Sequence, residues 1–382
     1  MNRIRPIAIH LPQFHPIPEN DAWWGKGFTE WTNVARATPL FQGHYQPHIP
    51  SDLGFYDLRL AEARKAQADL AAEYGIYGFC YYHYWFNGRR ILERPVKEIL
   101  ASGEPGFPFM LCWANENWTR VWDGGDKDVL LEQVYSEQDD INHIRELLPY
   151  FKDPRYIRID GKPVFAVYKS GLFPDIQRTL STWRREAAAE GMELYLCRFE
   201  RSGNEGEALM AGFDAAIEFQ PQDQKKPVNT IRTLKDEVTL RTIYNSIIFR
   251  ARRLLLPGRK NFPGQKLPGW VASYEAYVDT AMNSHEEVNY KRFPGVSPGW
   301  DNSSRRKTGF AILHGSTPQL FGKWLRSVLA RFKPYSLEEN LVFINAWNEW
   351  AEGNHLEPCQ KWGRQYLEEV KQSLREFDNN PC

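Results

Sequence analysis

Residues 78–113 read GFCYYHYWFNGRRILERPVKEILASGEPGFPFMLCW. The apolar runs at its two ends, Gly78–Tyr84 and Phe109–Trp113, have the length and aromatic content of buried β-strands. The segment between them, Pro95–Ala101, has the periodicity of a helix. A strand, a helix and a second strand in this order are typical of a parallel sheet.

The same alternation continues on both sides of this stretch. It predicts eight strands separated by helices, which is the pattern of a (β/α)8 TIM barrel with long βα-loop insertions. The predicted strands are Ile4–His10, Gly78–Tyr84, Phe109–Trp113, Val164–Tyr168, Leu194–Phe199, Ala215–Phe219, Tyr290–Val296 and Leu341–Asn345. The predicted helices are Leu58–Tyr74, Pro95–Ala101, Asp139–Phe151, Ile176–Glu190, Glu205–Ala211, Pro318–Phe332 and Gln365–Phe377.

A doubly wound sheet is the main alternative fold. It is disfavoured because no G-x-G-x-x-G or G-x-x-x-x-G-K-[ST] motif follows any predicted strand. We therefore expect residues 1–382 to form a single (β/α)8 domain. An inserted helical and basic segment at about 221–288 interrupts the repeat.

Composition narrows the class of protein. The 382 residues contain 48 Lys and Arg against 48 Asp and Glu, and this balance argues against a nucleic-acid binder. No apolar run approaches the ~20 residues that span a bilayer, and the N-terminal residues do not resemble a signal peptide. The five cysteines are scattered without a C-x-x-C motif, which indicates free thiols. We expect a cytoplasmic protein.

The inserted segment is the one region that suggests a partner other than substrate. Residues 241–260 contain five Arg and one Lys, no acidic residue, and interspersed Ile and Leu. This pattern indicates either an amphipathic helix packed on the barrel, or a helix that docks on an anionic membrane or an acidic protein. Peripheral membrane association through 241–260 is thus an open alternative.

The strongest candidate for chemistry follows the last predicted strand, in the sequence NAWNEWAEG at 345–353. Active sites of barrels lie at the C-terminal ends of the strands. Glu349 and Glu352 are three positions apart, so a helical turn would place both carboxylates on one side. Paired carboxylates are what glycoside cleavage requires. Trp347 and Trp350 would provide apolar walls that raise the carboxyl pKa. The alternative is that these glutamates are ordinary loop residues.

Other predicted strand ends carry aromatic, amide and carboxylate side chains. Sugar binding needs flat apolar surfaces for C–H groups and planar polar groups for hydroxyls. Any of these residues could instead be part of the core. The predicted substrate-binding residues are His10, Gln13, Tyr82, His83, Tyr84, Trp113, Asn115, Glu116, Trp118, Tyr168, Glu218, Gln220, Asn345, Trp347, Asn348 and Trp350.

We expect no metal or other cofactor. His10 and His15 lack the spacing of zinc ligands, and no H-E-x-x-H motif occurs. Asp126 and Asp128 form a D-x-D pattern, which holds a divalent cation in many glycosyltransferases. Here it lies in a glycine-rich stretch and is typical of a turn with Asx hydrogen bonds.

Five long motifs resemble the WbsX-like proteins, which are relatives of glycoside hydrolase family 99 and are often encoded with bacterial surface-polysaccharide genes. The motifs are IAIHLPQFHPIPENDAWWGKGFTEWTNV, HYQPHIPSDLGFYDLR, GIYGFCYYHYWF, CWANENWTRVWDG and INAWNEWAEGNHLEP. The resemblance extends from residue 4 to about residue 370 and is weakest over 225–285.

The resemblance implies a (β/α)8 barrel and metal-independent action on α-linked glycans with retention of configuration, as in endo-α-mannosidases. It implies that Glu349 deprotonates the sugar 2-hydroxyl, which attacks C1 to give a 1,2-anhydro sugar. Glu352 would then be the general acid and base. The expected substrate is a bacterial polysaccharide such as O-antigen or capsule.

Two other functions remain open at this stage. One is a glycosyltransferase of polysaccharide biosynthesis, a label that WbsX-like proteins also carry. The other is a non-catalytic glycan-binding protein that has kept the cleft of the barrel.

Overall fold

A computed structural model describes residues 4–120, 125–201, 212–221, 269–283 and 287–379. Its main sheet contains parallel strands β1 (Arg5–His10), β2 (Gly78–Phe86), β4 (Phe109–Trp113), β8 (Lys162–Val167), β9 (Tyr195–Glu200), β10 (Ala215–Glu218) and β16 (Leu341–Ile344). A further strand is split into β12 (Arg292–Phe293) and β13 (Gly295–Val296). All eight predicted strands are confirmed.

The split strand brings the two ends of the sheet together. β12 pairs in parallel with β10, and β13 pairs in parallel with β16. The order along the sheet is therefore β12-β10-β9-β8-β4-β2-β1-β16-β13. Since β12 and β13 are separated only by Pro294, the sheet is a nearly closed barrel, and the predicted (β/α)8 fold is confirmed.

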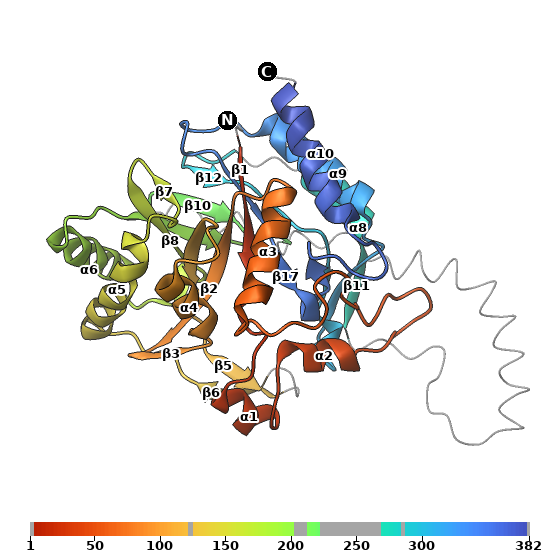
Figure 1. The fold of residues 1–382 in the computed structure, drawn as a ribbon, viewed down its shortest axis with the longest axis horizontal. Coiled ribbons are helices and arrows are strands. Elements are labelled where there is room, and N and C mark those ends of the chain that lie inside the picture. The colour runs from red at the N-terminus through yellow and green to blue at the C-terminus, as the bar shows by residue number, and fades with distance from the viewer. Residues whose placement is uncertain (1–3, 121–124, 202–211, 222–268, 284–286, 380–382) are drawn as a thin grey trace, which may run out of the picture.

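Helices surround the barrel (Figure 1). Pairs that contact each other include α5 with α6, α9 with α10 and α8 with α9. Six of the predicted helices are confirmed with small shifts at their ends. They are α3 (Ala61–Glu73), α4 (Arg94–Ser102), α5 (Glu137–Lys152), α6 (Ile176–Ala189), α9 (Pro318–Arg331) and α10 (Gln365–Asn379).

The start of α9 follows from its sequence. Pro318 occupies the first turn, where its missing N–H costs no hydrogen bond. The hydroxyl of Thr317 accepts a hydrogen bond from the backbone N–H of Leu320 at 3.3 Å. The neighbouring Ser316 hydroxyl instead bonds Tyr366 at 2.6 Å. Thr317 is therefore the capping residue.

Several elements were not predicted. They are the short helices α1 (Pro18–Trp24) and α2 (Glu30–Arg36), the helix α8 (Tyr274–Asn283), and the sheet of β11 (Trp270–Ser273), β14 (Trp300–Asp301) and β15 (Ala311–His314). In Figure 1, α1 and α2 lie at the lower end of the molecule together with the hairpin β5 (Trp118–Arg120) and β6 (Gly125–Leu131). This is the end at which the barrel strands finish.

The core consists of one large cluster of buried apolar side chains in and around the barrel. Cys80, Cys112 and Cys197 are buried in it as free thiols, as the sequence indicates. The predicted helix Glu205–Ala211, the basic segment 241–260 and Cys382 lie outside the described residues. No helix in the described part of the chain is long and apolar enough to cross a membrane.

Candidate active site

A cleft of about 1520 Å³ opens at the C-terminal ends of the barrel strands. Residues that follow seven of these strands contribute to its walls. One is Trp300 after β13, and there are six others. They are Gln13 after β1, Ala114 after β4, Tyr168 after β8, Arg201 after β9, Phe219 after β10 and Glu349 after β16. The cleft is therefore in the position where barrel enzymes carry their active sites.

Glu349 and Glu352 both line this cleft. Glu349 ends the short strand β17 (Asn348–Glu349), and Glu352 ends the 3₁₀ turn η6 (Trp350–Glu352). Residues three apart eclipse one another in a 3₁₀ turn, so both carboxylates point to the same side. Gly353 follows at φ 55°, a left-handed conformation that ends the turn and favours glycine.

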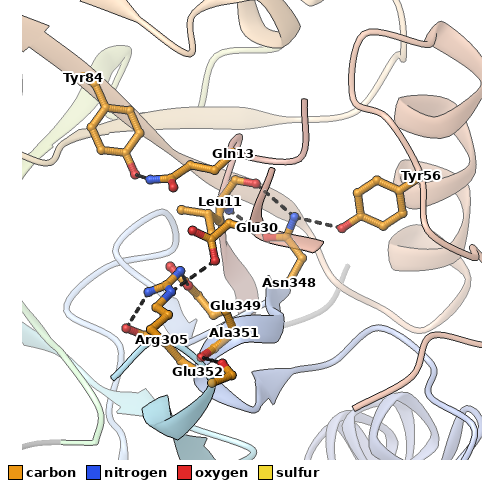
Figure 2. Close-up of polar contacts among 11 residues, drawn as sticks. Leu11, Gln13, Glu30, Tyr56, Tyr84, Arg305, Asn348, Glu349, Ala351 and Glu352 are labelled. Carbon is orange, nitrogen blue, oxygen red and sulfur yellow. Dashed lines mark hydrogen bonds and ion pairs between the residues drawn. The ribbon is translucent and has the colours of Figure 1, made fainter. Parts of the chain in front are cut away.

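Arg305 joins the two glutamates (Figure 2). Its Nη2 lies 2.9 Å from Oε2 of Glu349, and its Nη1 lies 2.8 Å from Oε1 of Glu352. Its Nε lies 3.1 Å from Oε2 of Glu30, the first residue of α2. One guanidinium thus holds three carboxylates, and each is contacted by a different nitrogen.

Burial and charge both act on the titration of this cluster. The side chains of Glu349 and Glu352 are 7% and 17% exposed. Burial raises the pKa of Glu349 to about 8 against the opposing charge of Arg305, and the nearby carboxylates of Glu352 and Glu30 act in the same direction as burial. Burial also raises the pKa of Glu352, against the opposing charges of Arg305 and Arg201. A raised pKa brings a carboxyl group closer to the working range of a general acid or base.

The loop that carries Arg305 is held by a second cluster. Asp301 accepts hydrogen bonds from Nε2 of Gln46 at 2.7 Å and from the backbone N–H of Ser303 at 3.0 Å, and pairs with His44 at 2.6 Å. The Ser304 hydroxyl donates to the carbonyl of Ala351 at 2.5 Å. These contacts fix the Arg305 loop against the Glu349–Glu352 loop.

Asn348 fixes the glutamate loop to the first strand of the barrel. Its Oδ1 accepts from the N–H of Leu11 at 2.7 Å, and its Nδ2 donates to the carbonyl of Leu11 at 3.0 Å. Nδ2 also lies 3.1 Å from the hydroxyl of Tyr56. Asn348 is fully buried and therefore positions Glu349 rather than facing the cleft.

Six of the sixteen predicted substrate-binding residues line the cleft, and for these a contact with substrate stays a prediction. Two of them bond each other, since Nε2 of Gln13 donates to the hydroxyl of Tyr84 at 2.9 Å. The six are Gln13, Tyr82, Tyr84, Glu116, Trp118 and Tyr168.

The other ten are not among the residues that line the cleft, and their side chains bond or pack against protein. His83 stacks on His143, Trp350 stacks on His355, and Asn115 fixes the chain at Lys169. These residues do lie at or near strand ends, as predicted, but their side chains pack in the core or contact loops. The ten are His10, His83, Trp113, Asn115, Glu218, Gln220, Asn345, Trp347, Asn348 and Trp350.

The sequence also predicts that Trp347 and Trp350 form the apolar walls beside the glutamates, and the structure shows a different arrangement. Trp347 and Trp350 are buried behind the glutamates and do not face them across the cleft. Other aromatic residues line it, many from elements that the sequence did not predict. They include Trp24, Trp118, Trp270 and Trp300.

Arg305 and Glu30 were missed in the sequence. Arg305 lies in the long connection between the predicted strand Tyr290–Val296 and the predicted helix Pro318–Phe332, and Glu30 lies in a short helix near the N-terminus. A buried Arg beside an acidic pair has no spacing signal in the chain. The only cue was Glu30 in the stretch GFTEWTNV, which is part of the first motif quoted above.

Metal-binding side chains do not cluster in the described part of the chain. No group of three or more His, Cys, Asp or Glu side chains there is arranged to hold a metal ion. Asp128 is exposed on β6, and the side chain of Asp126 lies outside what the structure describes.

Solved structures with a similar fold include glycoside hydrolases. Two structures of the GH99 endo-α-mannosidase from Bacteroides thetaiotaomicron match with TM-scores of 0.55 and 0.54, at 14% and 13% identity. They cover 98% of this chain and 97% and 98% of theirs. A protein described as glycoside hydrolase-like also matches, with a TM-score of 0.55, 14% identity, and coverage of 97% and 94%. At these identities the likeness shows the fold alone.

Comparison of sequences gives closer relatives. WxcX of Xanthomonas campestris pv. campestris, from strains ATCC 33913 and B100, is 41% identical over 374 residues, or 96% of this chain. The chain spans about half the length of these relatives, since the match covers 49% of WxcX. A family model described as glycosyltransferase WbsX matches residues 6–370, and the chain therefore belongs to this family.

Proposed function

We propose that this protein is a retaining glycoside hydrolase that cleaves α-linked bacterial polysaccharide, such as O-antigen or capsule, in the manner of an endo-α-mannosidase. The observation that carries the proposal is the pair Glu349 and Glu352. Glu349 is buried and Glu352 is partly buried at the C-terminal end of the barrel; both line the cleft and have pKa values raised by loss of hydration.

The proposed reaction has two steps. Glu349 takes the proton of the sugar 2-hydroxyl while O2 attacks C1, and Glu352 gives its proton to the departing glycosidic oxygen. The bond from C1 to the leaving group breaks and a 1,2-anhydro sugar forms. Water then attacks C1 and gives a proton to Glu352, while the bond from C1 to O2 breaks and Glu349 returns its proton to O2. Two inversions at C1 give net retention.

Arg305 supports both steps. As the guanidinium stays charged, it holds the two carboxylates at fixed positions whichever one carries a proton. Its own pKa is raised by Glu30, Glu349 and Glu352, although burial opposes the charge. Preorganised groups of this kind lower the cost of charge movement in the transition state.

The test uses oligosaccharides from bacterial polysaccharides and α-mannans, with products followed by NMR of the anomeric protons. We expect Glu349→Gln and Glu352→Gln each to lower turnover by roughly 10²–10⁴-fold. Glu368→Gln, on the exposed side of α10, is the matched control and should retain full turnover. Near wild-type turnover in either active-site variant would refute the assignment.

The family description as glycosyltransferase supports a second candidate, a transferase of polysaccharide biosynthesis. A transferase must bind an activated donor sugar. Calorimetric titration with nucleotide sugars in the presence of Mn²⁺ separates the two functions. Saturable binding of a nucleotide sugar, with no hydrolysis of any glycan, would favour the transferase.

A further inference from the structure

The charged residues that line the cleft are not all paired. Lys169 pairs with Glu116 at 2.5 Å, and Arg305 is shared among three carboxylates. Arg201 and Arg306 also line the cleft. Among the described residues, neither has a carboxylate within ion-pair distance. Two guanidinium groups therefore face the cleft without a protein counter-ion in the described structure.

Arg201 follows β9 and is held by aromatic rings. Its guanidinium lies 4.8 Å from the ring centre of Tyr168 and 5.0 Å from that of Phe219. It also donates a hydrogen bond to the Tyr168 hydroxyl. Stacking occupies the faces of a guanidinium but leaves most N–H groups in its plane available. Arg201 is half-buried, so its charge is fixed at the wall of the cleft before any ligand binds.

Arg306 comes from the loop between η5 (Asn302–Ser304) and β15, directly after Arg305. Among the described residues, its guanidinium makes one hydrogen bond, from Nη1 to the carbonyl of Gly309; this bond is 3.5 Å long and therefore weak. The side chain is half-buried and contributes to the cleft. Arg306 is thus a second cation with donors available for a ligand.

A planar fork of N–H donors matches the geometry of a carboxylate, which it can bind through two parallel hydrogen bonds. Neutral sugars are instead bound by aromatic faces and by single donors and acceptors, which this cleft also contains. Partly desolvated cations in a concave site also raise the local concentration of anionic ligands. The two arginines are therefore additional to what a neutral glycan requires.

We propose that the cleft takes acidic glycans and that Arg201 and Arg306 bind the carboxylate groups of their uronic acid or related sugars. This inference rests on the proposed function of the cleft as a glycan site and specifies the class of glycan. The alternative is that Arg201 does not contact the glycan and only influences the ionisation of Glu352, whose pKa the positive charge of Arg201 lowers.

The experiment measures binding, so that effects on catalysis do not enter. Glu352→Gln protein is applied to an array of acidic bacterial oligosaccharides, each printed in its native form and after chemical reduction of its carboxyl groups. The same array is probed with Arg201→Gln and Arg306→Gln in the Glu352→Gln background. Arg178→Gln removes an exposed arginine from α6 and is the matched control.

We expect binding of acidic oligosaccharides that falls at least tenfold on carboxyl reduction. Each cleft arginine variant should lose about tenfold or more in affinity for the native glycan and little for its reduced form, whereas Arg178→Gln should match the parent protein. Binding should also weaken as salt concentration rises. Arg201→Lys should recover only part of the affinity, because an ammonium cannot form the paired hydrogen bonds.

Equal binding of native and reduced glycans would overturn the inference while leaving the glycan site in place. If Arg201→Gln lost affinity equally for the native and the carboxyl-reduced glycan, the inference would also be overturned, since that pattern indicates a general structural role of Arg201. Binding of no glycan in either form would count against the proposed function itself, and the inference would fall with it.

Discussion

Arg305 carries one positive charge and contacts three carboxylates, so the fully ionised cluster has an excess of two negative charges. Such a cluster is costly when buried, because its charges have lost most of their hydration. Retention of a proton on a carboxyl group reduces this cost. The raised pKa values of Glu349 and Glu352 are the consequence.

Replacement of Arg305 tests whether its guanidinium stabilises the three carboxylates. In Arg305→Gln three buried carboxylates would lose their shared partner, and breaking a buried ion pair costs roughly 3–5 kcal/mol. We expect a lower melting temperature and a loss of turnover of at least roughly 10²-fold on any glycan substrate. The measurement is thermal unfolding at pH 8 and pH 5. A variant as stable as the wild type at pH 8 would contradict the ion-pair role.

The pH dependence of stability follows from Glu349. Its pKa is raised from 4.5 in the unfolded chain to about 8 in the fold. Between these values the unfolded chain releases a proton that the folded protein keeps. The free energy of unfolding therefore falls as pH rises through this window, at most by about 1.4 kcal/mol per pH unit, and levels off above pH 8.

The variant Glu349→Gln removes this titration. We expect it to melt at a higher temperature than the wild type at pH 8, with the difference shrinking toward pH 5, where the wild-type carboxyl is already protonated. Thermal unfolding across pH 5–9 measures this. A difference that does not change with pH, or a less stable variant at pH 8, would show that the ion pair with Arg305 outweighs burial.

At the scale of elements, the glutamate loop depends on a carboxyl group behind it. Glu357 is 2% exposed and accepts hydrogen bonds from Nε1 of Trp350 at 2.6 Å, from Nε2 of Gln67 at 2.7 Å and from the Tyr56 hydroxyl at 2.8 Å. It lies just after β18 (Asn354–His355), which pairs with β17. Through Trp350 and Gln67, Glu357 thus connects η6 and the end of β18 to α3.

Replacement of Glu357 should destabilise the loop that carries Glu349 and Glu352. In Glu357→Gln an amide donor would meet three donors, so at least one buried group would lose its partner at a cost of roughly 1–3 kcal/mol. We expect a lower free energy of unfolding and a lower kcat, with a smaller change in KM. Urea unfolding and steady-state kinetics measure both. Glu368→Gln is the control, and equal behaviour of the two variants would contradict the role of Glu357.

At the scale of the whole molecule, the barrel closes through the split strand at Arg292–Val296. β13 pairs with β16, and Gly295 lies against β10, where its backbone N–H donates to Oε2 of Glu218 at 3.2 Å. A Cβ atom on Gly295 would lie 2.0 Å from the carbonyl oxygen of Glu218. The closure therefore requires a residue without a side chain at this position.

Gly295→Ala should strain the closure of the barrel. Overpacking of this kind costs about 1–3 kcal/mol or more, because backbone must move to make room. Gly106→Ala is the matched control, since its Cβ would have no atom within 4 Å. Thermal unfolding of both variants compares them. If Gly295→Ala is as stable as Gly106→Ala, the contact is not needed for closure.

The strands could be predicted because each is a run of buried residues flanked by turns or helices. β2 shows this most clearly, as all nine of its residues are buried. α8 packs on α9 and lies at the end of the segment interpreted as a helical and basic insertion, and it was not predicted as a separate helix. The helices α1 and α2 and the strands β11, β14 and β15 were not predicted because each has only two to seven residues. Their periodicity is too brief to register as a helix or strand pattern.

The placement of side chains at strand ends was harder to predict. Tyr82 and Tyr84 line the cleft, but His83 between them stacks on His143 in the core. Alternation along a strand explains this difference, since neighbouring residues point to opposite faces. Which face is the cleft depends on the curvature of the barrel, and that is a property of all eight strands together.

The order of strands and helices, the barrel and the place of Glu349 and Glu352 after its last strand could all be predicted from the amino-acid sequence, because these depend on local patterns of burial and on spacing along the chain. Only the tertiary structure brought Arg305 to Glu30, 275 positions away, and to Glu349, 44 positions away. Only the tertiary structure also turned Trp347 and Trp350 away from the cleft. The physical reason is that charge balance and cleft walls arise from contacts between loops, whose relative positions are fixed by closure of the barrel.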